Sequence, residues 1–309
     1  MKAPKVSVIM PAYNVERYIG EAIESILNQT FTDFELIILN DYSTDKTLEI
    51  IKKYARKDKR IKFKNNQKNM GFIASLNRCL DIAQGKYIAK MDSDDISLPT
   101  RLEKQVAYLD NHPEVGLVGV GYRAFEKANF EVIFPPLVGF ADFLKNCSTT
   151  AFMLRKKIID NYHLRFRKEY LYTEDYDFYT RFIRYANIHN IPEVLYLYRW
   201  HGKNISITQK AVQEQNTNKV KNNILNFLTA DSQIQRKIRE LFDPRFEKTY
   251  QKYYPFDFLP IFRIKQKLGT KKYYLLNFIL IFKIKSKKNK TNCYLFGFIP
   301  FLKVKGKIK

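Results

Sequence analysis

Short apolar runs alternate with amphipathic segments through the first part of the chain. Apolar runs at 6–10, 34–39, 61–64 and 87–91 predict buried strands. Apolar residues recur at helical spacing between these runs, at about 15–29, around 48–54 and at about 71–83. Alternation of strands and helices with short connections is typical of a mostly parallel sheet whose two faces are covered by helices.

The second part of the pattern is less regular. Pro99 lies in the first turn of a predicted helix that runs to about 111, and a strand is expected over 115–120. Residues 121–146 show no clear pattern and are expected to form strands or loops. The remaining expected elements are a strand at 148–154 followed by a helix, a helix near 175–186, a strand at 194–198 and helical structure at about 207–241.

Polar residues follow three of the predicted strands at the point where each strand ends. They are Tyr13 and Asn14, Asn40 and Asp41, and Asp92 and Asp94. The carboxyl ends of parallel strands meet at one edge of a sheet, and ligands of open α/β sheets bind there. We therefore expect these side chains to line one crevice.

The most informative stretch is Lys86–Asp95, in which a buried strand runs directly into three carboxylates. Hard oxygen ligands at the edge of a sheet suit Mg²⁺ or Mn²⁺, which then bind a diphosphate. The alternative is an aspartate-rich loop that caps the next helix. Neither G-x-G-x-x-G nor G-x-x-x-x-G-K-[ST] occurs, so a dinucleotide dehydrogenase and a P-loop NTPase lose their main support.

Composition adds the expectation of an anionic partner. The chain has 309 residues and a formal net charge of +23. Its three cysteines are widely separated, so neither a disulfide framework nor a zinc spacing is present, and this fits a reducing cytosol. The sequence shows neither a signal peptide's apolar core nor an apolar run long enough to span a bilayer.

The positive charge is concentrated in the tail, 245–309, which holds 17 Lys and Arg against 2 Asp and Glu. Residues there repeat with a period of 20, as Tyr254, Tyr274 and Tyr294 illustrate. Basic–apolar–basic triplets predict short strands with one basic face. We expect this tail to bind an anionic membrane surface. Self-association or packing on the rest of the chain, and binding of nucleic acid, are the alternatives.

Six motifs in one order resemble glycosyltransferase family 2 over roughly residues 4–205. The opening strand ends in Pro11-Ala-Tyr-Asn14, and the D-x-D motif is matched by Asp92-Ser-Asp94. The other four are Asn40-Asp-Tyr-Ser-Thr-Asp45, Asn69-x-Gly71 with Asn77, Glu174-Asp175 and Arg199-Trp-His201. The resemblance implies an α/β fold of the GT-A type and inverting transfer of a sugar from a nucleotide donor, usually UDP-linked.

The resemblance also implies roles for single residues. Asp175 would be the general base and Glu174 its neighbour on the acceptor side. Asp94, with His201 and Asp92, would bind a divalent cation, Mn²⁺ or Mg²⁺. The nucleotide sugar would be bound by Pro11, Tyr13, Asn14, Asp41, Asn77, Asp92 and Ser93. Within this set, Tyr13 would stack on the base and Asp41 would accept its ring N–H.

Simpler structural roles compete with these assignments. Asp175 could cap the helix that it begins, His201 could be structural, and Tyr13 could pack in the core. The sequence also departs from the family pattern at Asn40, where Asp is common, and at Tyr42, where Gly is common. Leu76 stands where the family usually has Arg. These departures concern the nucleotide contacts and leave the fold untouched.

The chemistry of the expected reaction agrees with these residues. Inverting displacement needs a base for the acceptor hydroxyl and a cation that stabilises the departing diphosphate. It needs no covalent intermediate, and the sequence offers no convincing nucleophilic Ser or Cys. We therefore expect a catalytic domain at 1–205, with a donor half (1–100) and an acceptor half (101–205), then a helical extension at 206–244 and the basic tail at 245–309.

The expected function is a glycosyltransferase that builds a bacterial surface glycan, such as lipooligosaccharide or capsule. The donor would be a UDP-hexose or UDP-N-acetylhexosamine, and the acceptor a glycan or lipid-linked glycan. The enzyme would be cytoplasmic and peripheral on the inner face of the membrane, with no nucleic acid as partner. The alternative is a catalytically inactive protein that binds nucleotide sugars or membranes and acts in assembly.

Overall fold

The computed structural model describes residues 3–144, 149–202, 204–229 and 235, together with the backbone of five strands between 263 and 305. The chain divides into two compact units, 1–224 and 225–309. The predicted boundaries at 205 and 244 lie on either side of this division. Within the described residues, no helix has both the length and the apolar character that a membrane span requires.

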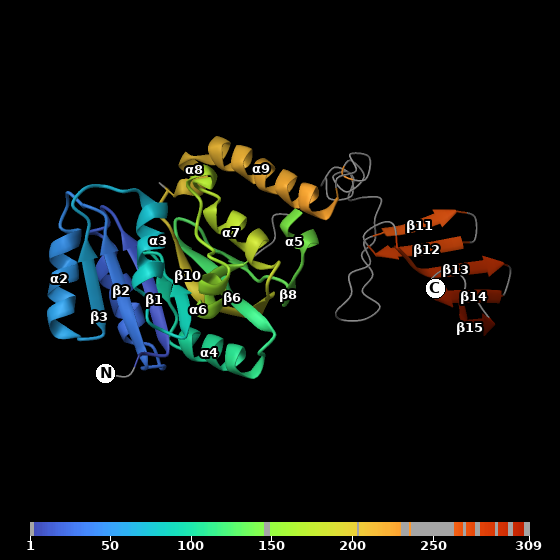
Figure 1. Cartoon of the computed structure of the whole chain (residues 1–309), viewed down its shortest axis with the longest axis horizontal. Helices are drawn as coiled ribbons and strands as arrows, with labels where there is room; N and C mark the ends of the chain where they lie inside the picture. The colour runs from blue at the N-terminus through green and yellow to red at the C-terminus, as the bar shows by residue number, and fades with distance from the viewer. Residues whose placement is uncertain are drawn as a thin grey trace. The chain divides into compact units, whose positions relative to one another are not determined.

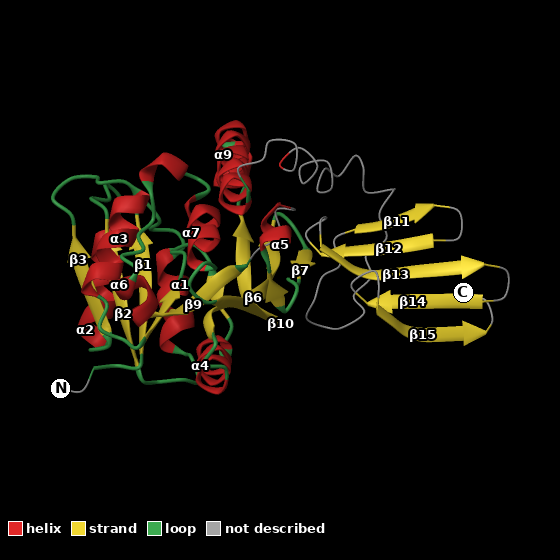
Figure 2. Ribbon diagram, turned by 45° about the vertical axis from the view of Figure 1, so that its right-hand side comes forward, coloured by secondary structure: helices red, strands yellow, loops and turns green. Residues whose placement is uncertain are grey.

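The first unit is a mixed sheet with helices packed on both of its faces (Figures 1 and 2). Its strands are β1 (Val6–Ala12), β2 (Phe34–Asn40), β3 (Ile61–Asn65), β4 (Tyr87–Lys90), β5 (Ile96–Ser97), β6 (Val115–Glu126), β7 (Phe130–Val132), β8 (Leu137–Val138), β9 (Thr150–Arg155) and β10 (Asn187–Trp200). Its helices are α1 (Ile19–Leu27), α2 (Thr47–Lys57), α3 (Phe72–Ile82), α4 (Arg101–Asn111), α5 (Phe140–Leu144), α6 (Lys156–Asn161), α7 (Glu174–Phe182) and α8 (Ile205–Thr208), with a 3₁₀ turn η1 (Lys168–Tyr170). Helix α9 (Lys210–Leu228) follows them and crosses the division between the units.

The strands of this sheet lie in the order β3-β2-β1-β4-β9-β6-β10-β5. Strands β3, β2, β1 and β4 are mutually parallel, and β10 is parallel to β6. Strand β9 runs antiparallel between β4 and β6 and so joins the two parallel groups. The predicted α/β fold with a mostly parallel sheet is confirmed.

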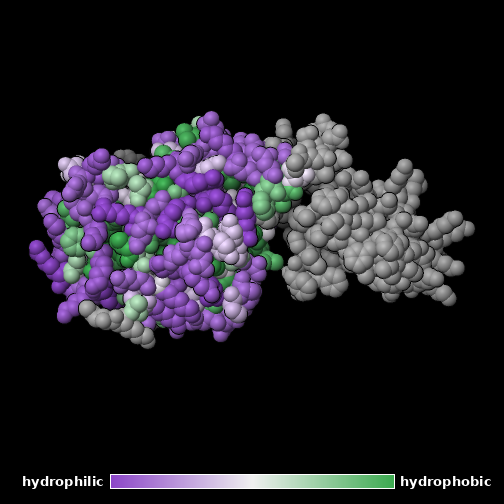
Figure 3. All heavy atoms as spheres, viewed as in Figure 1, coloured by the Kyte–Doolittle hydropathy of each residue, from purple (hydrophilic) through white to green (hydrophobic). Residues whose placement is uncertain are grey.

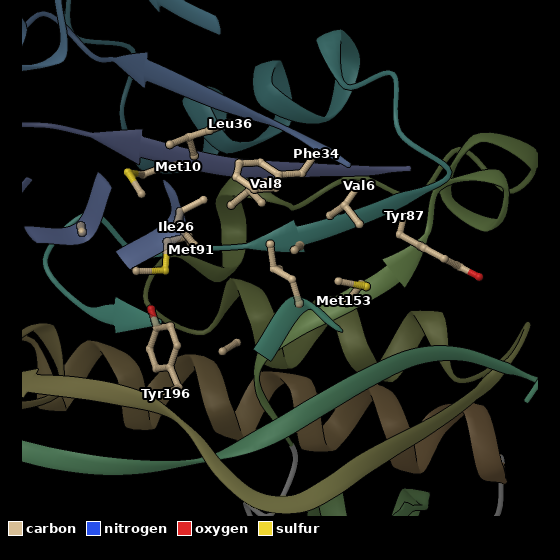
Figure 4. Packing of buried hydrophobic residues seen from close by; sticks show 14 of the residues in the cluster. Val6, Val8, Met10, Ile26, Phe34, Leu36, Tyr87, Met91, Met153 and Tyr196 are labelled. Atoms are coloured by element: carbon tan, nitrogen blue, oxygen red, sulfur yellow. The ribbon is translucent and has the colours of Figure 1, made fainter. Parts of the chain in front are cut away.

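The core lies between the sheet and its helices. Every residue of β1 and β2 is buried, because helices cover both faces of the sheet at these strands. Figure 4 shows Val8 and Met10 of β1 beside Leu36 of β2, with Met91 and Tyr196 in the same cluster. The outer surface of this unit is mostly hydrophilic on the face seen in Figure 3. This core fixes the ends of β1, β2 and β4, where the expected site begins.

Two strands are much longer than the sequence predicts. Strand β6 continues through Glu126 into the segment that showed no pattern, and β10 begins at Asn187 rather than at 194. The two strands pair along most of their length, with a register shift between Ile191 and Val194. Pro192 lies within that shift, and proline cannot donate a ladder hydrogen bond. This interruption explains why the sequence pattern predicts only the second half of the strand.

The second unit contains an antiparallel sheet in the order β11-β12-β13-β14-β15. Its strands are β11 (Arg263–Lys267), β12 (Thr270–Leu275), β13 (Ile279–Lys287), β14 (Lys290–Leu295) and β15 (Ile299–Lys305). Strands β12 and β14 begin 20 residues apart, and so do β13 and β15. The short strands expected from the basic–apolar–basic triplets are therefore present. Tyr254 and the predicted helical residues 230–234 and 236–241 lie outside the described residues.

Candidate active site

A cleft of about 1370 Å³ opens at the carboxyl edge of the first sheet. It is lined by the residues that follow β1, β2 and β4, by the N-terminus of α7, by the segment after β10 and by one side of α9. Polar residues from strand ends far apart in sequence therefore meet in one cleft, as the sequence predicts. Of the predicted site residues, those that line it are Pro11, Tyr13, Asn14, Asp41, Asp92, Ser93, Asp94, Glu174, Asp175 and His201.

Asp41 organises the donor side of the cleft. Only 3 % of its surface is exposed, and its Oδ1 accepts hydrogen bonds from Asn66 Nδ2 (2.6 Å) and from the Met70 amide (2.8 Å). Its Oδ2 accepts a bond from the Gly71 amide (2.8 Å), where φ is +84°. Only glycine adopts this backbone conformation without strain, which explains its place in the Asn69-x-Gly71 motif. A carboxylate offers about four lone-pair positions, so one remains for a ligand.

Asn14 links the loop after β1 to the loop after β2. Its backbone is in the left-handed conformation, with φ at 52°. Its Oδ1 accepts a hydrogen bond from the Thr44 amide (2.8 Å), and its own amide donates to Ser43 Oγ (3.0 Å). Tyr13 beside it is 47 % exposed and lines the cleft, so core packing is wrong as its role. Tyr42 also has a positive φ, 63°, which explains why glycine is common at this position.

The aspartate cluster after β4 is held in place by Arg199 of β10. The Arg199 amide donates to Asp95 Oδ1 (2.8 Å), and its Nε donates to the Asp94 carbonyl (2.7 Å). Its guanidinium also pairs with Glu21 and Glu126. Burial, and then the charges of Asp94 and Asp92, raise the pKa of Asp95 well above its ordinary value. Asp95 is thus buried beneath the turn and stabilises it, while Asp92 and Asp94 line the cleft.

His201 lies against Asp94 at the far side of this cluster. Its Nε2 is 3.3 Å from Asp94 Oδ2, and its ring stacks on Tyr18 with centroids 5.5 Å apart. Burial, and then the charge of Asp92, raise the pKa of Asp94, although the hydrogen bond with His201 opposes the change. The contact brings together two of the residues predicted to bind a metal.

These residues fit a cation that is shared with a substrate. Among residues 3–144, 149–202 and 204–229, no group of three or more His, Cys, Asp or Glu side chains converges to hold a metal alone. Mg²⁺ at nucleotide sites takes one or two carboxylates and completes its shell with phosphate oxygens and water. Asp94 with His201, and Asp92 two residues before, supply such an incomplete set of ligands.

Glu174 and Asp175 form the first turn of α7. Burial raises the pKa of Asp175 despite the opposing charge of Lys90. Burial, and then the charge of Asp175, raise the pKa of Glu174 to about 7. Asp175 Oδ1 and Glu174 Oε2 are buried and accept no hydrogen bond from any described residue. A half-buried carboxylate with an unused oxygen and a raised pKa is suited to accept a proton.

Lys90 connects Asp92 with Asp175, and it is not among the site residues that the sequence predicts. Its Nζ lies 2.9 Å from Asp92 Oδ1 and 3.2 Å from Asp175 Oδ2, and only 7 % of the residue is exposed. Burial lowers its pKa, but the charges of Asp175 and Asp92 outweigh that and hold the pKa well above the ordinary value. Lysine is almost never buried unless it is paired. The feature of the sequence that could have indicated Lys90 is a lysine at the end of a predicted buried strand.

The side chain of Asn77 is engaged by the backbone of Phe166. Its Nδ2 donates to the Phe166 carbonyl (2.8 Å), and its Oδ1 accepts from the Phe166 amide (2.9 Å). Both ends of the amide are therefore used to fasten α3 to the segment before η1. Asn77 is also absent from the lining of the cleft. The described contacts of Asn77 are thus structural, and a contact with the donor stays a prediction.

Comparison with known proteins defines the class. The fold places Asp92, Asp94, His201, Glu174 and Asp175 in one cleft. The chain matches the family described as Glycosyl transferase family 2 over residues 7–199. It belongs to this family and is a glycosyltransferase.

Two relatives illustrate the range of the family. An uncharacterized glycosyltransferase of Haemophilus influenzae is 36 % identical over 233 residues, which are 71 % of this chain and 72 % of that protein. The hyaluronan synthase of Pasteurella multocida is 30 % identical over 244 residues, which are 73 % of this chain but 23 % of that protein. The chain thus corresponds to about a quarter of that synthase.

Two solved structures show the same GT-A fold. Residues 1–349 of S. aureus TarS, in complex with UDP-GlcNAc, align with a TM-score of 0.65 and 23 % identity. The alignment covers 79 % of this chain and 73 % of that one. The mannosyltransferase PcManGT of Pyrobaculum calidifontis, in complex with GDP-Man and Mn²⁺, aligns with a TM-score of 0.59 and 17 % identity over 78 % of this chain and 70 % of that one.

Proposed function

We propose that this glycosyltransferase moves a sugar, with inversion, from a UDP-linked donor to a hydroxyl of a growing bacterial surface glycan. The observation that carries the proposal is that Asp175 and Asp94 line one cleft, where Lys90 pairs with both Asp175 and Asp92. UDP is favoured because the TarS structure contains UDP-GlcNAc. The sugar would be a hexose or an N-acetylhexosamine.

Asp175 would act as the general base. Inverting displacement requires the acceptor oxygen to attack opposite the leaving group while a base takes its proton. Asp175 Oδ1 is the buried oxygen without a hydrogen-bond partner among the described residues, and Oδ2 is held by Lys90 at 3.2 Å. One oxygen is thus held by Lys90, and the other is engaged by no described residue and would accept the proton. Glu174 would lie beside the acceptor, in a neutral form below about pH 7.

The donor diphosphate would bind near Asp94. Asp94, Asp92 and His201 would hold a Mn²⁺ or Mg²⁺ ion, which as a Lewis acid supplies stabilisation of the departing diphosphate. Arg199 keeps the carbonyl of Asp94 and the carboxylate of Asp95 in place from behind the turn. Tyr13 would stack on the base and Asp41 would accept its ring N–H, with Pro11, Asn14 and Ser93 completing the donor contacts.

The second unit would bring the enzyme to an anionic membrane surface. Residues paired across an antiparallel ladder share one face of the sheet. Register places the basic residues of all five strands, except Lys271, on one face: Arg263, Lys265, Lys267, Lys272, Lys283, Lys285, Lys287, Lys290, Lys303 and Lys305. Each lysine near an anionic bilayer contributes roughly 1 kcal/mol of binding, so such a face favours a membrane over self-association.

This part of the proposal can be tested with lipid vesicles that contain or lack phosphatidylserine. Replacing Lys265, Lys272, Lys283 and Lys285 by Gln in the full chain is expected to weaken binding at least 100-fold, from roughly 1 kcal/mol for each charge. Lys271→Gln, on the other face, is the matched control and should retain binding. Equal losses in both variants would contradict a basic face that binds membranes.

The alternative of an inactive nucleotide-sugar-binding or assembly protein makes a different prediction. Asp175→Asn removes the proposed base but keeps the size of the side chain. The proposal requires loss of transfer with UDP binding retained, as measured by calorimetry in the presence of Mn²⁺. A wild-type protein that binds UDP but never transfers or hydrolyses a sugar would favour the alternative.

A further inference from the structure

Helix α9 presents a polar stripe to the cleft. Its cleft-lining residues lie three or four positions apart on one side of the helix and are all polar: Gln213, Glu214, Thr217, Asn218 and Lys221. The adjoining stripe, with Val220 and Ile224, is fully buried. A packed helix that turns only amide, hydroxyl and charged groups toward a cleft offers many hydrogen-bonding groups to a polyhydroxylated ligand.

This stripe is fastened to the segment that leads into the proposed base. Gln213 Nε2 donates to the Tyr172 carbonyl (3.1 Å), and Asn216 Nδ2 donates to the Leu171 carbonyl (2.9 Å). Further along, Asn223 Nδ2 donates to the Tyr170 hydroxyl (2.7 Å). Three amides of one helix thus bind three successive residues just before Glu174. The position of α9 is coupled to that of the catalytic turn.

Tyr172 gives a second sign that this side of the cleft is functional. It lines the cleft with φ at 69°, in the left-handed region, where a bulky residue costs roughly 1–2 kcal/mol. Such conformations persist only where the surroundings impose them, and they concentrate at ligand sites. Here the hydrogen bond from Gln213 to its carbonyl helps to impose the conformation. The result is an aromatic ring beside a polar stripe.

Lys221 adds a charge to the stripe. It lies two turns beyond Gln213, roughly 12 Å along the helix. Burial lowers the pKa of Lys221. Within residues 3–144, 149–202 and 204–229, no carboxylate lies within ion-pair distance of its ammonium group. Glu214, on the same stripe, is 3.9 Å from Lys210 instead. A partly buried cation that no described carboxylate neutralises is matched by an anionic ligand.

We propose that Tyr172 and the polar stripe of α9 bind the acceptor glycan, and that Lys221 pairs with an anionic group on that glycan, a carboxylate or a phosphate. The proposal rests on the proposed function, because it places the acceptor on the Asp175 side of the cleft. The anionic group lies some distance along α9 from the catalytic turn, so it belongs to a neighbouring unit of the acceptor and takes no part in the chemistry.

The test measures glycan binding to the full-length protein by calorimetry, with UDP and Mn²⁺ present at saturation. The probes are a hyaluronan tetrasaccharide with carboxylates, a glycerol phosphate oligomer with phosphates, and neutral chitotetraose. The variants are Lys221→Met and Lys221→Arg. Lys219→Met is the matched control, since Lys219 is exposed on the same helix, does not line the cleft and donates a hydrogen bond to Asn216 Oδ1 (3.1 Å).

We expect one anionic probe to bind the wild type at least tenfold more tightly than chitotetraose. Lys221→Met should lose roughly tenfold or more, as for a charge-assisted hydrogen bond, while Lys221→Arg and Lys219→Met retain binding. The probe whose binding Lys221→Met weakens shows whether the anionic group of the glycan is a carboxylate or a phosphate. No preference for either anionic probe, or equal binding by Lys221→Met, would overturn the inference. UDP binding in the same samples tests the proposed function separately.

Discussion

Lys90 offers the sharpest perturbation of the site, because one ammonium group pairs with both the donor-side and the acceptor-side carboxylate. Its Nζ lies 2.9 Å from Asp92 Oδ1 and 3.2 Å from Asp175 Oδ2. Lys90→Met keeps the length and most of the volume of the side chain and removes the charge. Asp175 would then lose the contact that fixes its Oδ2. The Asp175 carboxylate would be held less firmly in position relative to the acceptor hydroxyl.

The size of the effect follows from the contacts and their exposure. Hydrogen bonds to charged groups contribute roughly 1.5–3 kcal/mol each. The side chains of Asp92 and Asp175 are 36 % and 32 % exposed, so water replaces part of what is lost. Taking about 2 kcal/mol for the loss of positioning in the transition state gives roughly a 30-fold decrease in kcat. The affinity for UDP with Mn²⁺ should not fall, because no donor-binding group has been removed.

The pH dependence gives a readout that a general loss of stability would not produce. The charge of Lys90 lowers the pKa of Asp175, so removing it raises that pKa. A base must be deprotonated to act, and the acidic limb of the kcat profile should therefore move to higher pH in Lys90→Met. Release of UDP from the donor, followed across pH, measures both effects.

Lys90→Arg retains the positive charge and serves as the control. It should recover part of the rate and return the acidic limb toward that of the wild type. An unchanged kcat and an unchanged acidic limb in Lys90→Met would refute the idea that Lys90 positions Asp175. The ion pairs would then be structural only.

Three further predictions concern single residues. Asn77→Ala should lower the free energy of unfolding by roughly 1–3 kcal/mol, because two groups of Phe166 lose their partner, and should leave UDP affinity unchanged; a selective loss of UDP binding would restore the donor role. Tyr42→Gly should be more stable to urea than Tyr42→Ala by about 1 kcal/mol, since only glycine relieves the φ of 63°; equal stabilities would contradict this. Glu174→Gln should gain stability over wild type as pH rises from about 4.5 to about 7, because the native state holds the Glu174 proton in that range and the unfolded state does not; parallel stability curves would show that its pKa is ordinary.

The sequence predicted the donor half of the fold well, and there is a physical reason. Strands β1, β2 and β4 are buried on both faces, so their apolar runs stand out, and each is followed directly by the polar residues of the cleft. The long pair of β6 and β10 was only partly predicted. Its ends are partly exposed, and Pro192 interrupts the register.

Contacts between side chains that are far apart along the chain could not be predicted from the sequence. Lys90 looked like one more basic residue in a basic protein until the structure placed it between carboxylates that are 83 residues apart along the chain. Asn77 matched a motif, yet its partner is the backbone of Phe166. In both cases the role of the residue depends on contacts that only the fold creates.

The central claim is that Asp175 and Asp94 serve one metal-dependent sugar transfer. The measurement that tests it most directly is nucleotide release from UDP-, GDP-, CDP- and dTDP-sugars, with Mn²⁺ and then with EDTA, for wild type, Asp94→Asn and Asp175→Asn. We predict release of UDP from a UDP-sugar by the wild type. EDTA and both substitutions should abolish this release, while Asp175→Asn should retain UDP binding. Undiminished release with EDTA or in Asp175→Asn would contradict it.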